Sequence, residues 1–265
     1  MLAHARLEHA GVGQAIGGIV DGRPVLIAGD SSVPPRLRVW DPAGGDEAEP
    51  AEFYAGFEST SDIAAGELGG EPVVVWGRYD GTVSIVDPNG DRAVREMYHP
   101  GIRVFGVALA TVDGREVIVA GGDDRVVVGD PVTEEWRGGP DDFIGDDIGG
   151  DAEGDGGDDG DDEDEPDFDR VGIRCLDAGL VDGRPVAVTG AADGAVRVWD
   201  LGALKVVAEG EHGDEVSAVR VTELEGRAVA ITGGRNGFVR VWALDGVLGD
   251  VAGGLIGDDS GVAPV

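Results

Sequence analysis

Cysteine is almost absent from this chain of 265 residues. Cys175 is its only cysteine, so no disulfide can form within the chain. The residues around it, Val171-Gly-Ile-Arg-Cys-Leu-Asp, are typical of a short strand, which predicts a packed and unreactive thiol. A nucleophilic cysteine is therefore not expected.

Long apolar runs are also missing. No stretch approaches the ~20 apolar residues of a membrane span, and residues 1–12 lack the apolar core of a secretory signal. We therefore expect a cytoplasmic protein. Aromatic residues make up only 5% of the chain, so its core must consist mainly of Val, Ile, Leu and Ala.

Positive charge is scarce. The chain has 20 Lys and Arg against 53 Asp and Glu, which gives a net charge of −33. Nucleic-acid phosphates and anionic membranes repel such a protein, so neither is expected as a partner. Lys205 is the only lysine, and the abundance of Gly, Ala, Val, Asp and Arg is typical of a GC-rich bacterial genome.

What the chain does contain is a repeat. In its clearest copy, the turn Asp182-Gly183-Arg184 precedes a β-branched strand, a second turn with Gly, and a strand that ends in Trp199-Asp200. The order recurs five times with a period of about 43 residues. Gly and Asp at such turns are typical of tight hairpins, so each repeat is predicted to be a meander of strands. The repeats span approximately 10–44, 58–90, 101–132, 170–202 and 214–244.

A period of this length with a Trp-Asp ending resembles the WD-repeat propellers. The resemblance covers nearly the whole chain outside one insertion, and it implies an all-β propeller of four-stranded antiparallel blades. In that family a His, a Ser or Thr, an Asp and the Trp of each repeat form a structural hydrogen-bond network. The residues at these positions are His9, Asp30, Trp40, Asp80, His99, Asp124, Thr189, Asp193, Trp199, His212, Thr232, Asn236 and Trp242.

Three of the four histidines, His9, His99 and His212, fall at one repeat position. A structural role is therefore expected for them. Zinc sites bring their ligands together at tighter spacings than one per blade, so the sequence predicts neither a metal site nor a cofactor.

The resemblance also implies how the ring closes. The fifth repeat has three strands up to Trp242, and residues 2–8 align with the stretch that would supply its outer strand. We therefore expect five blades closed by the N-terminal strand in a monomer, with residues 247–265 as a flexible tail. The alternatives are an open fragment that closes by association and an orphaned repeat fragment of a larger multidomain regulator.

Residues 139–169 form an acidic insertion between the third and fourth repeats. More than half of residues 141–169 are Asp or Glu and none is Lys or Arg, so the segment cannot bury enough apolar surface to order itself. A helix-loop-helix calcium site is not predicted, because Pro166 stands where the bidentate Glu is required. A solvated loop, a site for a basic partner and another metal site remain as interpretations. So does recognition of four apolar anchors, Phe143, Ile144, Ile148 and Phe168.

A partner is expected at the mouth of the propeller channel. In the resembled family, the residue before the turn Asp often faces that surface. Tyr and Arg are typical of binding hot spots, and neighbouring arginines would favour an acidic or phosphorylated peptide. The residues before the turn are Gly29, Tyr79, Asp123, Ala192 and Arg235, and the partner-binding candidates are Arg78, Tyr79, Asp123, Arg125 and Arg235.

The leading interpretation is a noncatalytic protein-interaction scaffold, because no catalytic triad, Cys/His pair or phosphate-binding Gly loop can be placed on neighbouring strands. The alternative is a lactonase-like propeller hydrolase, in which carboxylates converge on a central calcium. Its candidate ligands would be Asp30, Asp80, Asp124 and Asp193.

Overall fold

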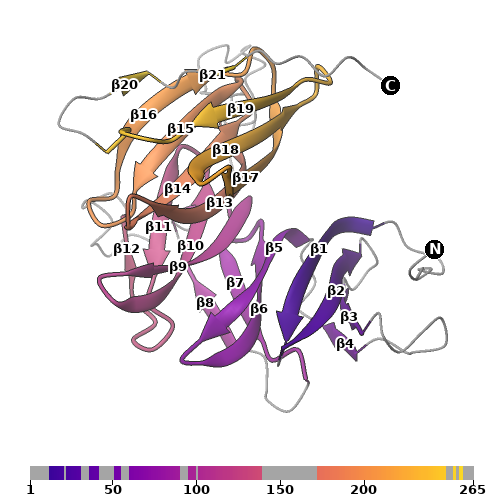
Figure 1. Ribbon diagram of the computed structural model, residues 1–265. Helices are drawn as coiled ribbons and strands as arrows, with labels where there is room; N and C mark the ends of the chain where they lie inside the picture. Colours follow the sequence, from indigo (N-terminus) through magenta and orange to yellow (C-terminus); the bar gives the residue numbers. More distant parts are fainter. Residues whose placement is uncertain are drawn as a thin grey trace, which may run out of the picture.

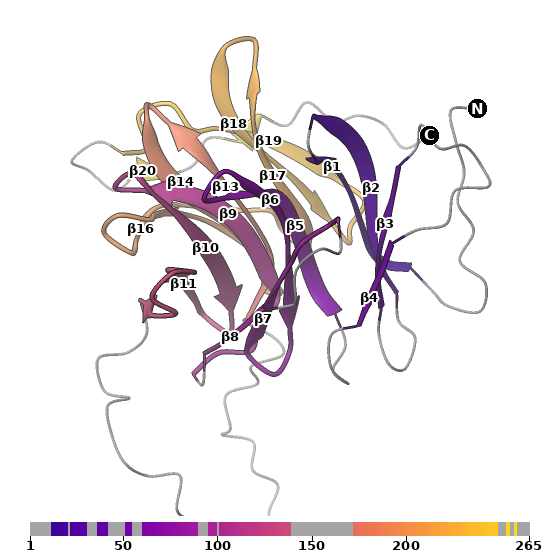
Figure 2. The same ribbon diagram turned by 90° about the horizontal axis from the view of Figure 1, so that it is seen from below.

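The computed structural model describes residues 12–20, 22–30, 36–41, 51–54, 60–89, 95–99, 101–138, 172–248, 253–254 and 257–258. These residues form strands and the turns between them, and none of them is helical. The strands make five antiparallel four-stranded sheets, arranged as the blades of a β-propeller (Figure 1, Figure 2). The prediction of an all-β propeller is confirmed.

Each sheet is a meander whose strands lie in chain order. The first contains β1 (Val12–Val20), β2 (Arg23–Asp30), β3 (Arg36–Trp40) and β4 (Ala51–Tyr54). The second contains β5 (Thr60–Leu68), β6 (Glu71–Arg78), β7 (Thr82–Val86) and β8 (Arg95–Tyr98). The third contains β9 (Gly106–Val112), β10 (Arg115–Gly122), β11 (Arg125–Gly129) and β12 (Trp136–Arg137).

The fourth sheet contains β13 (Ile173–Val181), β14 (Arg184–Ala191), β15 (Ala195–Asp200) and β16 (Lys205–Glu211). A short strand, β20 (Gly253–Gly254), adds to its edge in parallel with β16. The fifth sheet contains β17 (Val216–Leu224), β18 (Arg227–Gly234), β19 (Val239–Ala243) and β21 (Gly257–Asp258).

The turn that marks each repeat joins the first strand of a sheet to the second. In the third sheet, Asp113 and Gly114 have φ angles of 52° and 74°. Two consecutive positive φ angles are those of a type I′ turn, whose twist matches the twist of the strands it joins. Asp and Gly tolerate these angles, so the residues of the repeat select the hairpin.

Neighbouring sheets pack face to face, and their buried side chains form four apolar clusters. One cluster joins the first sheet to the second, and the others join the second to the third, the third to the fourth and the fourth to the fifth. The middle sheets are covered on both faces. This explains why a strand such as β6 is buried at every position from Val73 to Arg78 instead of alternating.

A chain of buried hydrogen bonds fixes the fifth sheet. Nδ1 of His212 lies 2.9 Å from Oγ1 of Thr232, and Nε1 of Trp242 donates to the same oxygen at 2.8 Å. In the fourth sheet, Nε1 of Trp199 donates to Oγ1 of Thr189 at 3.0 Å. In each sheet the threonine hydroxyl therefore gives a hydrogen-bond partner to ring nitrogens that would otherwise be buried without one.

The remaining members of the expected network are placed differently. Nδ1 of His99 accepts a hydrogen bond from the amide of Gly101, and its ring meets the edge of Trp136. Trp40 is partly buried on β3. His9 and the side chain of Asp30 lie outside the described residues.

The outer strand of the fifth sheet corrects one expectation. It is β21, from the C-terminal part of the chain, that pairs with β19. Residues 2–8, which were expected in this place, lie outside the described residues. The stretch expected as a flexible tail follows β19 in the chain and supplies two strands, β20 beside β16 and β21 beside β19.

Two carboxylates tie neighbouring sheets together. Oδ2 of Asp62 on β5 accepts a hydrogen bond from the amide of Val107 on β9 at 2.9 Å. Oδ2 of Asp177 on β13 accepts one from the amide of Val221 on β17 at 2.8 Å. Burial raises the pKa of Asp62 from 3.8 to about 7, and burial also raises the pKa of Asp177.

Replacing Thr232 with Val is expected to lower the free energy of unfolding by about 2–4 kcal/mol, because it removes the oxygen that both His212 and Trp242 need. Urea unfolding monitored by Trp fluorescence measures the change. Thr232→Ser keeps the hydroxyl and is the matched control, so a loss of equal size in both variants would contradict this role.

Replacing Asp62 with Asn is expected to flatten the pH dependence of stability. The folded-state pKa is raised, so the wild type binds a proton more tightly when folded and loses stability as the pH rises from 3.8 to about 7. Above this range the variant is expected to be more stable by about 1–4 kcal/mol. Urea unfolding between these pH values tests this, with Asp193→Asn at an exposed turn as the control. Parallel curves for wild type and Asp62→Asn would show that the expectation is wrong.

Candidate functional site

One end of the propeller collects the features expected of a binding surface. We call it the mouth end. It holds the described turns between the second and third strands of the sheets and the described residues just before the inner strands, because antiparallel strands bring these connections to the same end. The amide of Ile173 donates to the carbonyl of Asp123, and the amide of Arg235 donates to the carbonyl of Glu215.

The turn carboxylates at the mouth end are used by the backbone. Oδ1 of Asp80 accepts a hydrogen bond from the amide of Thr82, and Asp193 does the same for Ala195. Oδ1 of Asn236 accepts one from the amide of Phe238, so a neutral amide serves here as well as a carboxylate. Such Asx turns are a local device for closing hairpins.

The turn carboxylates do not lie close to one another. Within the part of the chain that the structure describes, no three His, Cys, Asp or Glu side chains lie close enough together to hold a metal ion. Oδ1 of Asp124 instead pairs with Nε of Arg125 at 2.9 Å. The convergence of carboxylates that a lactonase-like site requires is therefore not supported by the described residues.

An aromatic and cationic cluster spans three sheets at the mouth end. The rings of Tyr79 and Phe105 meet edge to face, with their centroids 5.0 Å apart. Cζ of Arg103 lies 5.4 Å from the Phe105 centroid, and Cζ of Arg174 lies 5.2 Å from it. We call these four residues the Phe105 cluster. Tyr79 follows β6, Arg103 and Phe105 precede β9, and Arg174 lies on β13.

Asp123 orients the cluster. Its Oδ2 accepts a hydrogen bond from the amide of Arg103 at 3.0 Å, and its Oδ1 accepts one from Nε of the same residue at 3.1 Å. The guanidinium of Arg103 is thus held beside the ring of Phe105. A cation in this position is attracted by the ring, and the interaction strengthens where water is excluded.

Only part of the sequence-predicted site comes together here. Tyr79 belongs to the cluster and Asp123 supports it, but Arg78 is buried, with Nη1 bonded to Oε1 of Glu96. Arg125 pairs with Asp124 in its own turn, and Arg235 pairs with Glu215 in the fifth sheet. Arg78 therefore does not add positive charge to an exposed surface.

Sequence reasoning missed Phe105, Arg103 and Arg174. Phe105 and Arg174 occupy the same position of the repeat, eight residues before the marker turn, where the second and fifth repeats have Ser61 and Ser217. A change from small polar to aromatic and cationic residues at one repeat position is the signal that could have found Phe105 and Arg174.

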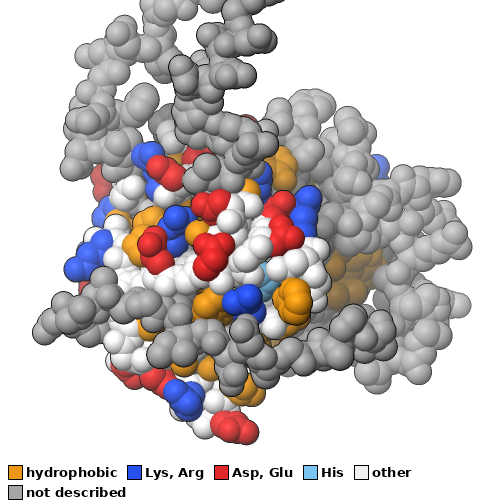
Figure 3. Space-filling model, turned by 90° about the horizontal axis from the view of Figure 1, so that it is seen from above, with side chains coloured by type: hydrophobic (Ala, Val, Ile, Leu, Met, Phe, Trp, Pro, Cys, Tyr) orange, Lys and Arg blue, Asp and Glu red, His pale blue; other side chains and the backbone are white. Residues whose placement is uncertain are grey.

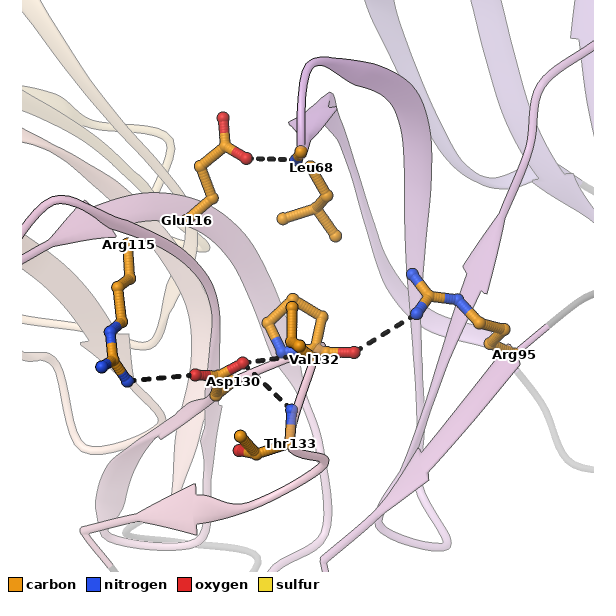
Figure 4. A pocket seen from close by; sticks show the side chains of 9 residues that line it. Leu68, Arg95, Arg115, Glu116, Asp130, Val132 and Thr133 are labelled. Atoms are coloured by element: carbon orange, nitrogen blue, oxygen red, sulfur yellow. Dashed lines mark hydrogen bonds and ion pairs between the residues drawn. The ribbon is translucent and has the colours of Figure 1, made fainter.

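The opposite end carries a cavity of about 500 Å³ between the second and third sheets (Figure 4). Its polar groups are bonded to one another. Nη1 of Arg95 donates to the carbonyl of Pro131, and Nη1 of Arg115 lies 3.6 Å from Oδ2 of Asp130. Oδ1 of Asp130 accepts the amides of Val132 and Thr133, and these bonds hold the pKa of this carboxyl below its ordinary value. The polar groups that line the cavity thus stabilise the loops around it.

One face of the molecule carries a mixture of charges. On the face shown in Figure 3, acidic and basic side chains lie side by side, and hydrophobic side chains reach the surface in small groups. Among the described residues no helix is long and apolar enough to cross a membrane.

The comparisons with known proteins show the fold. No family model matches the chain, and no curated protein matches it either. Among solved structures, the chain is similar to a crystal structure of BBS1N in complex with ARL6DN, soaked with mercury, with a TM-score of 0.60 and 15% sequence identity. The match covers 91% of this chain and 68% of that chain. At this identity the likeness shows the propeller fold alone, so membership of the WD-repeat family stays a prediction.

Cys175 is expected to react with thiol reagents only after unfolding. Burial raises the pKa of its thiol to about 12, so the thiolate that reacts is scarce in the folded protein. At pH 8, labelling by an aromatic disulfide reagent is expected to be more than about a hundredfold slower in the folded protein than in urea. Similar rates in both conditions would contradict a packed thiol.

Proposed function

We propose that this protein is a noncatalytic interaction scaffold that binds an acidic or phosphorylated protein segment at its mouth end. The observation that carries the proposal is the Phe105 cluster, in which two guanidinium groups flank one aromatic ring and a second ring packs on its edge. The cluster is built from three sheets, and a segment lying across them would contact all four residues.

The chemistry of the cluster fits such a ligand. Arginine presents a planar set of donors that matches the oxygens of a carboxylate or phosphate, and aromatic rings supply rigid apolar contact area. Tyr and Arg are also the residue types that most often dominate binding energy in interfaces. The net charge of −33 repels acidic ligands at long range. Moderate salt is therefore expected to speed association, because it screens that repulsion more than the short contacts at the cluster.

Several finer points belong to the same proposal. The resemblance of the repeats to WD-repeat propellers supports a scaffold of that kind, and the composition supports a bacterial source. A single, buried cysteine suits a cytoplasmic location. Residues 139–169 lie outside the described residues, and their charge supports a second role for them as a site for a basic partner.

Replacing Phe105 or Arg174 with Ala is expected to weaken binding at least about tenfold while leaving stability within about 1 kcal/mol. The measurement is fluorescence anisotropy with a labelled library of Asp-rich and phosphorylated peptides, followed by capture from a native lysate. Arg174→Lys keeps the charge but loses the planar donor set, so it is expected to fall between the wild type and Arg174→Ala.

Tyr98→Ala is the matched control, because Tyr98 is an exposed aromatic residue outside the cluster. It is expected to bind like the wild type. If no acidic peptide binds, or if Tyr98→Ala weakens binding as much as Phe105→Ala does, the Phe105 cluster is not the binding site.

A further inference from the structure

The packing between sheets stops at the two ends of the series. The inner strands β1, β5, β9, β13 and β17 contact one another in that order, but β17 and β1 share no comparable contact. Among the described residues, none of the four apolar clusters joins the fifth sheet to the first. Figure 1 shows these two sheets, gold and indigo, as the ends of the series. In the part of the chain that the structure describes, one face of each therefore has no neighbouring sheet, and we call the pair of faces the seam.

The seam face of the fifth sheet carries exposed apolar side chains, although Val229 on the same face is buried. Val239 is 55% exposed, whereas its counterparts in the other sheets are at most 2% exposed. Leu224 is 52% exposed, and its counterparts are at most 8% exposed. The counterparts of Val239 are Leu37, Val83, Val126 and Val196, and those of Leu224 with described side chains are Leu68, Val112 and Val181.

The seam face of the first sheet shows the same difference. Leu26 is 40% exposed, whereas all four of its counterparts are 0% exposed. These counterparts are Val74, Ile118, Ala187 and Ala230. No atom lies within 4 Å of the place that a Cβ of Gly17 would occupy. On both faces, therefore, apolar residues are exposed at positions that are buried in the other sheets.

The two seam faces also match in shape. Between the second and third sheets, Gly66 leaves a hole that Leu109 fills, and a Cβ at Gly66 would lie 2.7 Å from Cδ1 of Leu109. Thr222 of the fifth sheet occupies the position of Gly66, and Gly17 of the first sheet occupies the position of Leu109. At the seam the side chain belongs to Thr222 of the fifth sheet, and the glycine is Gly17 of the first sheet. A side chain on one face therefore still lies opposite a glycine on the other.

We propose that the seam binds a second copy of this chain, with the fifth sheet of one copy packed against the first sheet of the other. The two faces are the two halves of an interface that the chain already makes four times within itself. The contact is heterologous, because different surfaces of the two copies meet in it. This inference is independent of the proposed function.

Closure within one chain is disfavoured by the four existing interfaces. Bringing the fifth sheet onto the first would change the angle at each of them, and their side chains are close-packed and almost fully buried. A second copy can bind at the seam without any change in the four interfaces between sheets within each chain.

A disulfide across the seam tests the proposal. Gly17→Cys and Thr222→Cys are made in separate chains, mixed, and oxidised mildly. Position 17 has open space and Thr222 is exposed, so both variants are expected to fold. Cys175 is only partly exposed, and the raised pKa of its thiol keeps it from competing. The mixture is expected to form a disulfide between the two variants at least about tenfold faster than either variant pairs with itself, as judged by mass spectrometry.

The double variant distinguishes the two modes of closure. At low protein concentration, an internal disulfide between positions 17 and 222 in the monomer would show that the chain closes on itself and would overturn the proposal. Covalent oligomers whose yield rises with protein concentration support it. Equal, slow pairing in every sample would also overturn it, because that result is expected from random collisions.

Light scattering of the unmodified protein gives a second, independent measurement. The mean mass is expected to rise above that of one chain over about two orders of magnitude in concentration, and to rise further with moderate salt, which screens the repulsion between acidic copies. Leu224→Asp with Val239→Asp is expected to remain a monomer, while Val132→Asp, at an exposed apolar residue away from the seam, associates like the wild type. A wild type that stays monomeric throughout overturns the proposal.

Discussion

The structure depends on face-to-face packing between sheets that are apolar on both sides. Such a sheet is stable only with a neighbour on each face, because every uncovered Val, Ile or Leu keeps its cost of hydration. The second, third and fourth sheets have both neighbours, and the second strand of each is buried almost continuously. The first and fifth sheets have one each, so exposed Leu26 and Val239 follow from the same rule that buries their counterparts.

This constraint also explains where the charge lies. A chain with a net charge of −33 can fold because the sheet faces carry few charges and most acidic residues lie in turns, at edges and in the insertion. The carboxylates that do enter the interfaces have a structural use. Asp62 and Asp177 accept backbone amides of the next sheet, and burial raises the pKa of both because the ionised form is poorly solvated there.

A repeated scaffold also allows function to arise from small changes. The position that holds Ser61 and Ser217 in two sheets holds Phe105 and Arg174 in two others, and adjacent sheets bring this pair together. Backbone hydrogen bonds fix the loops around this pair, and Asp123 fixes the side chain of Arg103. A binding surface therefore needs no new element, since neighbouring blades present equivalent positions side by side.

The sequence by itself determined the local structure. The period of the repeat, the Asp-Gly turns and the β-branched strands predicted five meanders, because turn geometry and strand preference act over a few residues. The Thr232 and Trp242 contact could also be predicted, since it lies within one repeat. Contacts between repeats were decided only by the tertiary structure. Arg78 was expected at the surface, but packing buried it, and the Phe105 cluster was missed because its members come from three sheets. The unpartnered faces at the seam depend on how far successive sheets turn about the propeller axis. That angle is set by the summed packing of four interfaces, and no single repeat encodes it.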